Sequence, residues 1–369
     1  MKILNNQDEV DQTLKQEELL KINSFTVECP CTISSNESLF HNFYGWTFKE
    51  EVVFNGTFTK DINIEGTTFY KNVSFHNVKF DCKIRFYSSI FKSTVNFNNT
   101  KFEDLADFWN VTFEKKIIFY KTDFKGITVF AITKFKENVL FTYTLIKEVV
   151  IFRQTKFHKG LDLSLAIISG YCSFFDIRFY DFKDIKDIDD DEKYEDAVSA
   201  LGVIPKKNRR ETYRIIKNQL KAQSNNYDAV EYSNLEAKVF NSQVCFRVKE
   251  NKILKKPIGN LIIMLLNRIS NNHGKSWSLG IVFTILIGLF FFNFSLSFTK
   301  ISSFSKNCNF IDTLDFYIKY FTEFMNPTHN IIYMDSYYPE NLFYVFDFLG
   351  RIFVGFGIYQ TIQAFRKYR

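Results

Sequence analysis

The sequence predicts a parallel β-helix of stacked, four-sided coils, followed by helices of which two cross a membrane. Two observations predict this fold class. A large apolar residue, usually Phe, recurs at alternating steps of six and five residues from Phe69 to Phe179, and two long apolar segments lie in the C-terminal part of the chain. A fixed period of eleven residues indicates identical structural units stacked on one another.

The recurring aromatic residues are expected to form the core of the β-helix. Residues two positions before them are small or β-branched, and positions two apart in an extended segment share a face. The residues in between are mostly Asn, Thr, Ser, Val, Ile and Lys, which favours strands over a coiled coil. The predicted core includes Phe75, Phe80, Phe86, Phe91, Phe97, Phe102, Phe108, Phe113, Phe119, Phe124, Phe130, Phe135, Phe141, Phe152 and Phe157.

Each step of five or six residues forms one side of a coil, so the segment 41–182 gives about six and a half coils, or roughly 30 Å of rod at ~4.8 Å per coil. Phe54 and Phe58 are one residue too close, so we expect a local irregularity there. Residues 1–40 are predicted to be an N-terminal cap, of which 1–20 are polar and charged and lack the apolar region of a signal peptide. Their stretch 9–20 is expected to form a helix that caps the open end of the β-helix.

Units such as VSFHNVKFDCK (73–83), VNFNNTKFEDL (95–105) and VIFRQTKFHKG (150–160) resemble those of pentapeptide-repeat proteins, which carry a small residue two positions before a central Leu or Phe. This resemblance implies a right-handed quadrilateral β-helix over 41–182. Some members of the family imitate DNA and bind a topoisomerase, which requires a strongly acidic surface that this segment lacks. Its basic residues are interleaved with acidic ones along the chain, so no nucleic-acid partner is predicted.

The protein is predicted not to be an enzyme and to need neither a cofactor nor a metal. The five His are isolated, the six Cys show no framework spacing, and no catalytic motif is present. Cys29 and Cys31 lack neighbours that would complete a metal site. The acidic run 184–196 lacks the Gly and the distal Glu of a calcium loop.

Residues 183–207 are predicted to be an acidic, solvated linker. In 208–250, apolar spacings of three and four predict two amphipathic helices joined by a Ser-Asn-Asn turn. Two interpretations of this helical hairpin remain. Either it packs on the last coil of the β-helix, or its basic face binds anionic lipid or the acidic run. The basic face consists of Arg209, Arg210, Arg214, Lys217 and Lys221.

Residues 277–369 are predicted to form a membrane domain with two spans. The segment 277–298 carries no charge and is long enough to cross ~30 Å of hydrocarbon as a helix, and the second span is 341–365. Residues 251–276 contain a shorter apolar helix that is expected to lie in the membrane interface. Basic residues flank the spans on the side of both termini, whereas the loop 299–340 is acidic, so the positive-inside rule places both termini in the cytoplasm.

The loop between the spans contains an amphipathic segment, 309–325, followed by a helix-breaking run. A span, a short helix, a breaker and a second span form the layout of two-span channel subunits, in which a pore helix precedes the selectivity filter. A helix lying on the outer surface is the other interpretation, and the potassium filter sequence is absent. The candidate pore or intramembrane residues are Asn326, Pro327, Thr328, His329, Asp347 and Arg351.

Two of these candidates, Asp347 and Arg351, lie inside the second span, four residues apart on one helix. We expect them to pair, which lowers the cost of burying each charge. They form either a structural pair between subunits or charges that line a pore. Gly350, Gly355 and Gly357 are expected to let a neighbouring helix approach closely.

The C-terminal half resembles bacterial pentapeptide-repeat proteins that append a two-span, ion-channel-like region. The segments that carry this resemblance are RRETYRIIKNQL (209–220), DAVEYSNLEAKVF (228–240), ISNNHGKSW (269–277) and GRIFVGFGIYQTIQAFRKY (350–368). The resemblance implies a multi-pass protein of the bacterial inner membrane.

Two functions follow as hypotheses. The first is a channel-like subunit with a cytoplasmic β-helix as sensor or scaffold, which acts as a homo-oligomer because two spans are too few to enclose a water path. The alternative is a non-conducting, membrane-tethered scaffold whose β-helix binds a cytoplasmic protein partner. In both cases membrane lipid surrounds the spans.

Overall fold

The computed structural model describes residues 2–16, 24–35, 41–188, 190–249, 258–300 and 310–366. The chain divides into two compact units. The first comprises Met1–Asn225 with Val239–Gln243, and the second comprises Asn226–Lys238 with Val244–Arg369.

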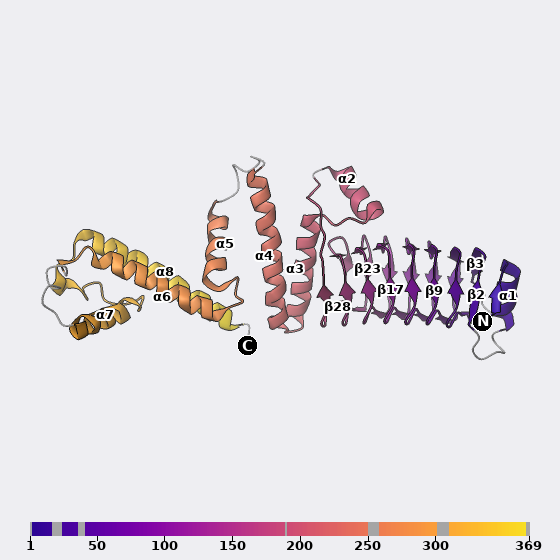
Figure 1. The fold of residues 1–369 in the computed structure, drawn as a ribbon, viewed down its shortest axis with the longest axis horizontal. Coiled ribbons are helices and arrows are strands. Elements are labelled where there is room, and N and C mark those ends of the chain that lie inside the picture. Colours follow the sequence, from indigo (N-terminus) through magenta and orange to yellow (C-terminus); the bar gives the residue numbers. More distant parts are fainter. Residues whose placement is uncertain are drawn as a thin grey trace. The chain divides into compact units, whose positions relative to one another are not determined.

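The first unit is a parallel β-solenoid, as predicted. Strands of successive coils pair in parallel, so that Phe80 stands opposite Phe102 and Phe102 opposite Phe124. Figure 1 shows the strands as a ladder of short arrows, one coil after another. We name the four sides of the coil faces A to D in chain order, so that face A is opposite face C.

The strands are short, and most contain two residues. Face A contains β1 (Lys2–Leu4), β2 (Phe25–Val27), β5 (Thr47–Phe48), β9 (Thr68–Phe69), β13 (Ile90–Phe91), β17 (Thr112–Phe113), β21 (Lys134–Phe135), β25 (Lys156–Phe157) and β29 (Arg178–Phe179). Face B contains β3 (Cys31–Ser34), β6 (Val52–Asn55), β10 (Val73–Ser74), β14 (Val95–Asn96), β18 (Ile117–Ile118), β22 (Val139–Leu140) and β26 (Leu161–Asp162). Face C contains β7 (Thr57–Phe58), β11 (Lys79–Phe80), β15 (Lys101–Phe102), β19 (Asp123–Phe124), β23 (Leu145–Ile146) and β27 (Ile167–Ile168). Face D contains β4 (His41–Asn42), β8 (Ile62–Asn63), β12 (Ile84–Arg85), β16 (Ala106–Asp107), β20 (Thr128–Val129), β24 (Val149–Ile151) and β28 (Tyr171–Ser173).

The core of the solenoid consists of aromatic rings stacked from coil to coil. All the predicted core Phe are buried, and the ring of Phe108 lies 4.6 Å from that of Phe86 and 4.8 Å from that of Phe130. Buried hydroxyls beside them are satisfied by the preceding coil, since Thr100 donates to the carbonyl of Phe75 at 2.7 Å and Thr122 to that of Phe97 at 2.8 Å. The repeat therefore satisfies these buried hydroxyls from within, although the hydroxyl of Thr128 lacks a partner.

The solenoid begins earlier than residue 41, which was the predicted boundary. Strands β1 to β3 precede that residue, and face A has nine strands, more than the predicted six and a half coils. The first coils bury Val27 and Ile33 in place of the regular Phe, so the sequence repeat did not reveal them. The expected irregularity between Phe54 and Phe58 is present as the four-residue strand β6 and a left-handed Gly56 with φ of 101°.

A helix covers the N-terminal end of the solenoid, as expected. This helix is α1 (Gln7–Gln16), which buries Val10 and Leu14, and the amide of Gln7 bonds to the backbone of Thr32 in β3. Most of the predicted segment 9–20 falls in α1, and residues 17–20 lie outside the described ones. The covered end hides the first layer of the core from other chains.

The prediction of a solvated linker at 183–207 is wrong for most of its length. Helix α2 (Asp191–Asp196) continues into the π-helical turn η1 (Ala197–Leu201), and Val198 and Ile204 pack on Leu140 of face B. The run of acids dominates the composition of this segment. The short apolar stretch that follows it supplies the buried contacts.

Helix α3 (Lys206–Ala222) closes the other end of the solenoid. The backbone NH of Leu163 donates to the Thr212 hydroxyl at 2.9 Å, and Gln219 and Gln223 bond to the backbone of Cys172. This confirms the packing interpretation for the first helix of the hairpin. Helix α4 (Asn226–Lys249) follows after a turn.

The second unit contains the apolar helices. They are α5 (Ile258–Asn271), α6 (Trp277–Leu296), α7 (Phe310–Phe324), the 3-10 turn η3 (Asp335–Tyr337) and α8 (Asn341–Phe365). Helices α6 and α8 are long and apolar enough to cross a membrane. These two helices lie side by side, and α7 lies beside the end of the pair that is away from α5 (Figure 1). The end of α5 is fixed to α8 by the side chain of Asn271, which donates to the carbonyl of Gln360 at 3.0 Å.

Candidate functional site

The candidate site is held by a close crossing of α6 and α8, which small residues make possible. A Cβ atom added to Gly357 would overlap Thr284, and one added to Gly350 would overlap the ring of Phe324. Gly355 is less crowded, because an added Cβ would lie 4.0 Å from Pro327. Of the three predicted packing glycines, Gly350 and Gly357 are therefore required for close packing, and Gly355 is not.

Helix α7 and the residues after it fold back along α6 and α8. The ring of Phe324 packs on Phe292 at 5.5 Å between centroids, and Met325 contacts Gly288 of α6. The chain then turns at Asn326 and Pro327. Phe291, Phe292, Phe324 and Val354 form the buried apolar cluster around this turn.

The turn places His329 directly against Asp347 of α8. The Nε2 atom of His329 lies 2.9 Å from Oδ1 of Asp347, and Nδ1 lies 2.7 Å from the carbonyl oxygen of Asn326. Both side chains are almost completely buried, with exposed fractions of 0% and 1%. The two residues are 18 positions apart in the sequence, and their spacing gives no helical or strand signal that would predict the contact.

Arg351 completes the cluster, which we call the buried ionic cluster (His329, Asp347 and Arg351). Its Nε atom donates to Oδ2 of Asp347 at 2.9 Å, so the predicted pair one turn apart on α8 is present. The side chain of Arg351 remains 18% exposed. Each oxygen of the Asp347 carboxylate therefore has its own partner, because Oδ1 contacts His329 and Oδ2 contacts Arg351.

The backbone of the turn orients the imidazole of His329 in the buried ionic cluster. The carbonyl of Asn326 can only accept a hydrogen bond, so Nδ1 of His329 is the donor in their contact. The Nε2 atom, on the other side of the ring, is thereby directed at Oδ1 of Asp347.

Tyr333 borders the cluster and was not predicted from the sequence. Its ring meets that of His329 edge to face at 4.6 Å. The remaining predicted residue, Thr328, donates to the side chain of Asn326 at 2.8 Å and contributes to the turn.

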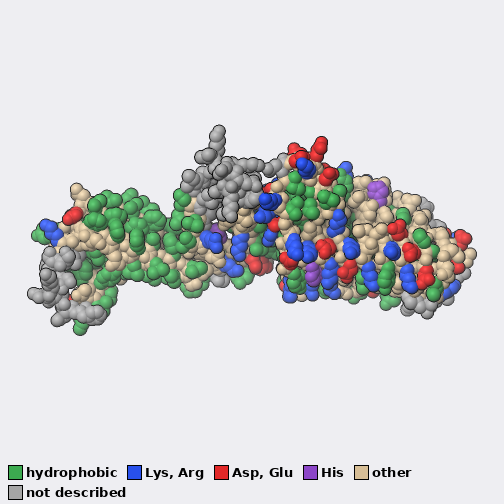
Figure 2. Space-filling model, turned by 45° about the horizontal axis from the view of Figure 1, so that its top comes forward, with side chains coloured by type: hydrophobic (Ala, Val, Ile, Leu, Met, Phe, Trp, Pro, Cys, Tyr) green, Lys and Arg blue, Asp and Glu red, His purple; other side chains and the backbone are tan. Residues whose placement is uncertain are grey.

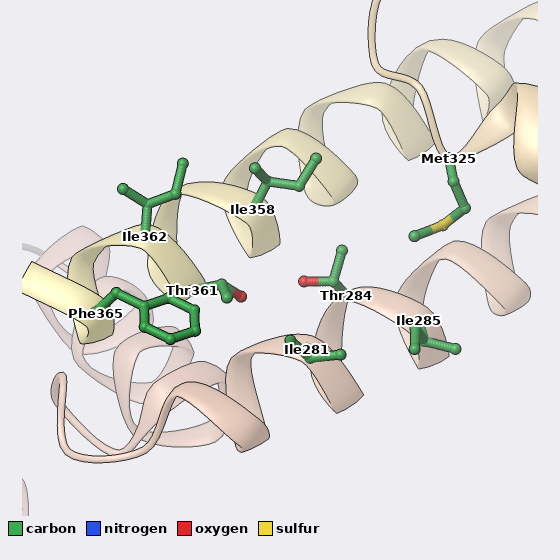
Figure 3. Close-up of a pocket in the computed structure, with 8 residues that line it drawn as sticks. All are labelled: Ile281, Thr284, Ile285, Met325, Ile358, Thr361, Ile362 and Phe365. Atoms are coloured by element: carbon green, nitrogen blue, oxygen red, sulfur yellow. The ribbon is translucent and has the colours of Figure 1, made fainter.

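An apolar groove of about 240 Å³ lies between α6 and α8, next to the end of α7. Figure 3 shows isoleucines of both helices on its sides, with Thr284 and Thr361 between them and Met325 at one end. Both threonines donate to carbonyls of their own helices, at 2.7 Å and 3.0 Å. The groove therefore offers no free hydroxyl donor at these positions.

Metal binding has no support in the described part of the chain. Among those residues, no group of three or more His, Cys, Asp or Glu side chains is placed to hold an ion. The buried ionic cluster contains one imidazole and one carboxylate, and the guanidinium of Arg351 already occupies the second carboxylate oxygen. Its arrangement is suited to holding charged groups inside an apolar unit.

The fold and the site define a β-solenoid protein with a helical unit whose two long helices are able to cross a membrane. Residues 64–112, within the solenoid, match the family described as pentapeptide repeats (9 copies). No curated protein and no solved structure matches the chain. The protein thus carries a pentapeptide-repeat β-solenoid, as the resemblance of its units implied.

Proposed function

We propose that this protein is a channel-like subunit of a bacterial inner membrane, active as a ring of several copies, with the β-solenoid as a cytoplasmic sensor or scaffold. Both termini lie in the cytoplasm in this proposal, in agreement with the positive charges that flank the spans. The observation that carries the proposal is the path of α7 and the turn that follows it.

Helix α7 runs from near the start of α8 toward the middle of the pair formed by α6 and α8. Near the start of α8, Phe316 and Tyr320 contact Tyr337 of η3. Met325, in contrast, reaches Gly288, which is about 12 Å from the end of α6 at 1.5 Å per residue. A helix lying flat on the outer surface would not reach this depth, so the path favours a re-entrant pore helix over an interfacial one.

The return of the chain supports the same interpretation. Pro327 lies beside Gly355, about 21 Å along α8 from its start, and His329 then meets Asp347 about 9 Å from that start. In this proposal, the turn between α7 and η3 is therefore the most deeply inserted non-helical segment among the described residues. Non-helical backbone at membrane depth is tolerated where it is covered by protein or lines a water-filled path.

The buried ionic cluster adds a reason for several copies. The partly exposed guanidinium of Arg351 would face hydrocarbon in an isolated pair of spans, which is costly. In a ring, this side of α8 faces a neighbouring copy or the water path. Two spans alone are too few to enclose such a path.

The test is ion flux through liposomes that contain the full chain, combined with the number of copies per particle in detergent. The proposal predicts flux from an oligomer and a changed conductance for Arg351→Gln. The control is Asp335→Asn, which removes an exposed charge of the opposite sign outside the cluster. Liposomes that stay impermeable although they contain folded protein, or a particle with one copy, would contradict the proposal.

The second candidate is a non-conducting scaffold, and one observation favours it. The solenoid exposes 45% of Trp109, whose ring meets that of Tyr87 edge to face at 5.3 Å. Exposed aromatic residues are common in protein interfaces. This candidate predicts capture of a defined cytoplasmic protein that is lost in Trp109→Ala and retained in Asp347→Asn, with no ion flux.

A further inference from the structure

Face A of the solenoid carries a compact set of basic side chains on three consecutive strands. We call it the basic grid, and it consists of Lys134, Lys136, Lys156, His158 and Arg178. Lys134 stands opposite Lys156 in β25, and Lys156 stands opposite Arg178 in β29. Lys136 and His158 follow the same two core Phe residues and form a second column beside the first.

Such columns of like charge are unfavourable by themselves. Neighbouring parallel strands lie about 4.8 Å apart, and like charges directly opposite one another destabilise a sheet. Among the described residues, Lys134, Lys136 and Lys156 make no ion pair and no side-chain hydrogen bond. Arg178 has Asp176 at 3.5 Å.

Other coils of the same solenoid compensate their charges. Lys125 lies 2.8 Å from Glu103 of the preceding coil, and Lys49 lies 2.8 Å from Glu28. Figure 2 shows positive and negative side chains in mixed rows along much of the solenoid. The basic grid therefore differs from these compensated coils.

The acidic run near α2 does not neutralise the grid. Glu195, next to the last residue of α2, accepts a hydrogen bond from Tyr143 at 2.9 Å. Tyr143 lies in the corner between faces B and C, and face C is opposite face A. The nearest acid along the columns is Glu114, which follows the core Phe113 one coil before Lys136.

We propose that the basic grid binds the phosphate groups of anionic phospholipids at a membrane surface. The grid is flat and rigid, because it lies on strands fixed by the stacked core. Helices of the same chain are able to span a membrane, which would give the solenoid a high local concentration of headgroups. The ring of Tyr180 is already stacked on His158 at 4.8 Å, so it is not a free platform for the bases of a nucleic acid.

The test measures whether the full chain, held in phosphatidylcholine nanodiscs, binds to added vesicles. The vesicles are loaded with sucrose so that they and any bound protein can be sedimented. The vesicles contain phosphatidylcholine alone or phosphatidylcholine with phosphatidylglycerol. The variant is Lys134→Gln/Lys156→Gln/Arg178→Gln. The matched control, Lys101→Gln/Lys125→Gln/Lys147→Gln, removes three positive charges from the opposite side of the solenoid.

The proposal predicts that the unmodified chain sediments only with the anionic vesicles. Since each basic residue near such a surface contributes about 1 kcal/mol, the grid variant is expected to bind about 100-fold more weakly, and the control only slightly more weakly. Equal losses in both variants, or binding to neutral vesicles, would overturn the proposal.

Two further experiments distinguish phospholipid from a free anion and from nucleic acid. Inorganic phosphate at the ionic strength of the buffer should not release the vesicles, and release at matched ionic strength would indicate a site for a free anion instead. A single-stranded oligonucleotide should bind the nanodisc particle more weakly than the vesicles do. Tight, grid-dependent binding of the oligonucleotide without vesicle binding would assign the face to nucleic acid and refute the lipid proposal.

Discussion

The β-solenoid and the helical unit both bury polar groups, but they satisfy them in different ways. In the solenoid, buried hydroxyls such as Thr100 and Thr122 bond to the preceding coil, and the arrangement repeats along the rod. In the helical unit, His329 and Asp347 depend on one particular fold-back of the chain. A repeated solution indicates a structural role, whereas a single buried charge cluster in an apolar unit is a candidate for function.

The two regions also differ in how their elements approach one another. Large rings hold the coils of the solenoid together, whereas small residues such as Gly357 allow α6 and α8 to touch. Truncating a core side chain should therefore destabilise the solenoid, whereas enlarging a small residue should destabilise the helical unit. The following substitutions test this contrast.

The largest effect is expected for Phe108→Ala in the solenoid. The substitution leaves a cavity between the rings of Phe86 and Phe130, and it should lower the free energy of unfolding by about 4 kcal/mol. Urea unfolding followed by the β-strand circular dichroism signal measures it. Ile127→Ala, at a side chain that is 46% exposed, is the control and should cost much less. Equal losses would show that the stacked core is not the main source of stability.

A somewhat smaller effect is expected for Asp347→Asn in the helical unit. It leaves the guanidinium of Arg351 without its carboxylate partner, which should cost about 3 kcal/mol. Unfolding of the helices in detergent, followed by circular dichroism, measures this loss. The β-strand transition should remain at its original position, and a shift of both transitions would contradict an effect confined to the helical unit.

A third test adds volume to the helix crossing. Gly350→Ala places a methyl group against the ring of Phe324 and should cost about 1 to 3 kcal/mol. Gly355→Ala, in the same helix, has room for its methyl group and serves as the matched control. It should be neutral or slightly stabilising, because Ala favours a helix. The same unfolding experiment in detergent measures the loss of stability in both variants, and equal losses would contradict the prediction.

The smallest effect is a pH dependence in the solenoid that comes from His158. Burial, with the charges of Lys136, Lys156 and Lys134, lowers the pKa of His158, while Glu114 opposes the shift. The unfolded chain then binds more protons than the folded one as the pH falls below about 6.5. The solenoid should therefore lose stability between that pH and the lower folded pKa. His158→Gln should remove this loss, and an unchanged pH profile in the variant would exclude His158 as its source.

Much of the fold could be predicted because its signals are local and periodic. The recurring Phe identified the solenoid, and the absence of charge between Trp277 and Leu296 identified α6. The acidic run hid the packing of α2 and η1, since composition indicates solubility but does not say which nearby apolar residues find a partner. The first coils escaped detection because Val27 and Ile33 replace the regular Phe there.

The candidate site was only partly accessible to this reasoning. Residues four apart share a helix face, so the spacing of Asp347 and Arg351 sufficed to predict their pair. The contact of His329 with Asp347 and the position of Tyr333 depend on how the turn after α7 folds back, which no spacing encodes. The basic grid was likewise hidden, because its charges are interleaved with acids along the chain and meet only across coils.

The sequence by itself determined the period of the solenoid, its aromatic core and the two apolar helices. These features follow from local repetition and from the transfer of apolar side chains out of water, which the order of residues records directly. Only the tertiary structure decided which charged groups meet. Electrostatic and hydrogen-bonding contacts act over a few ångströms, and the residues that make them are brought within that distance by the folding of distant segments.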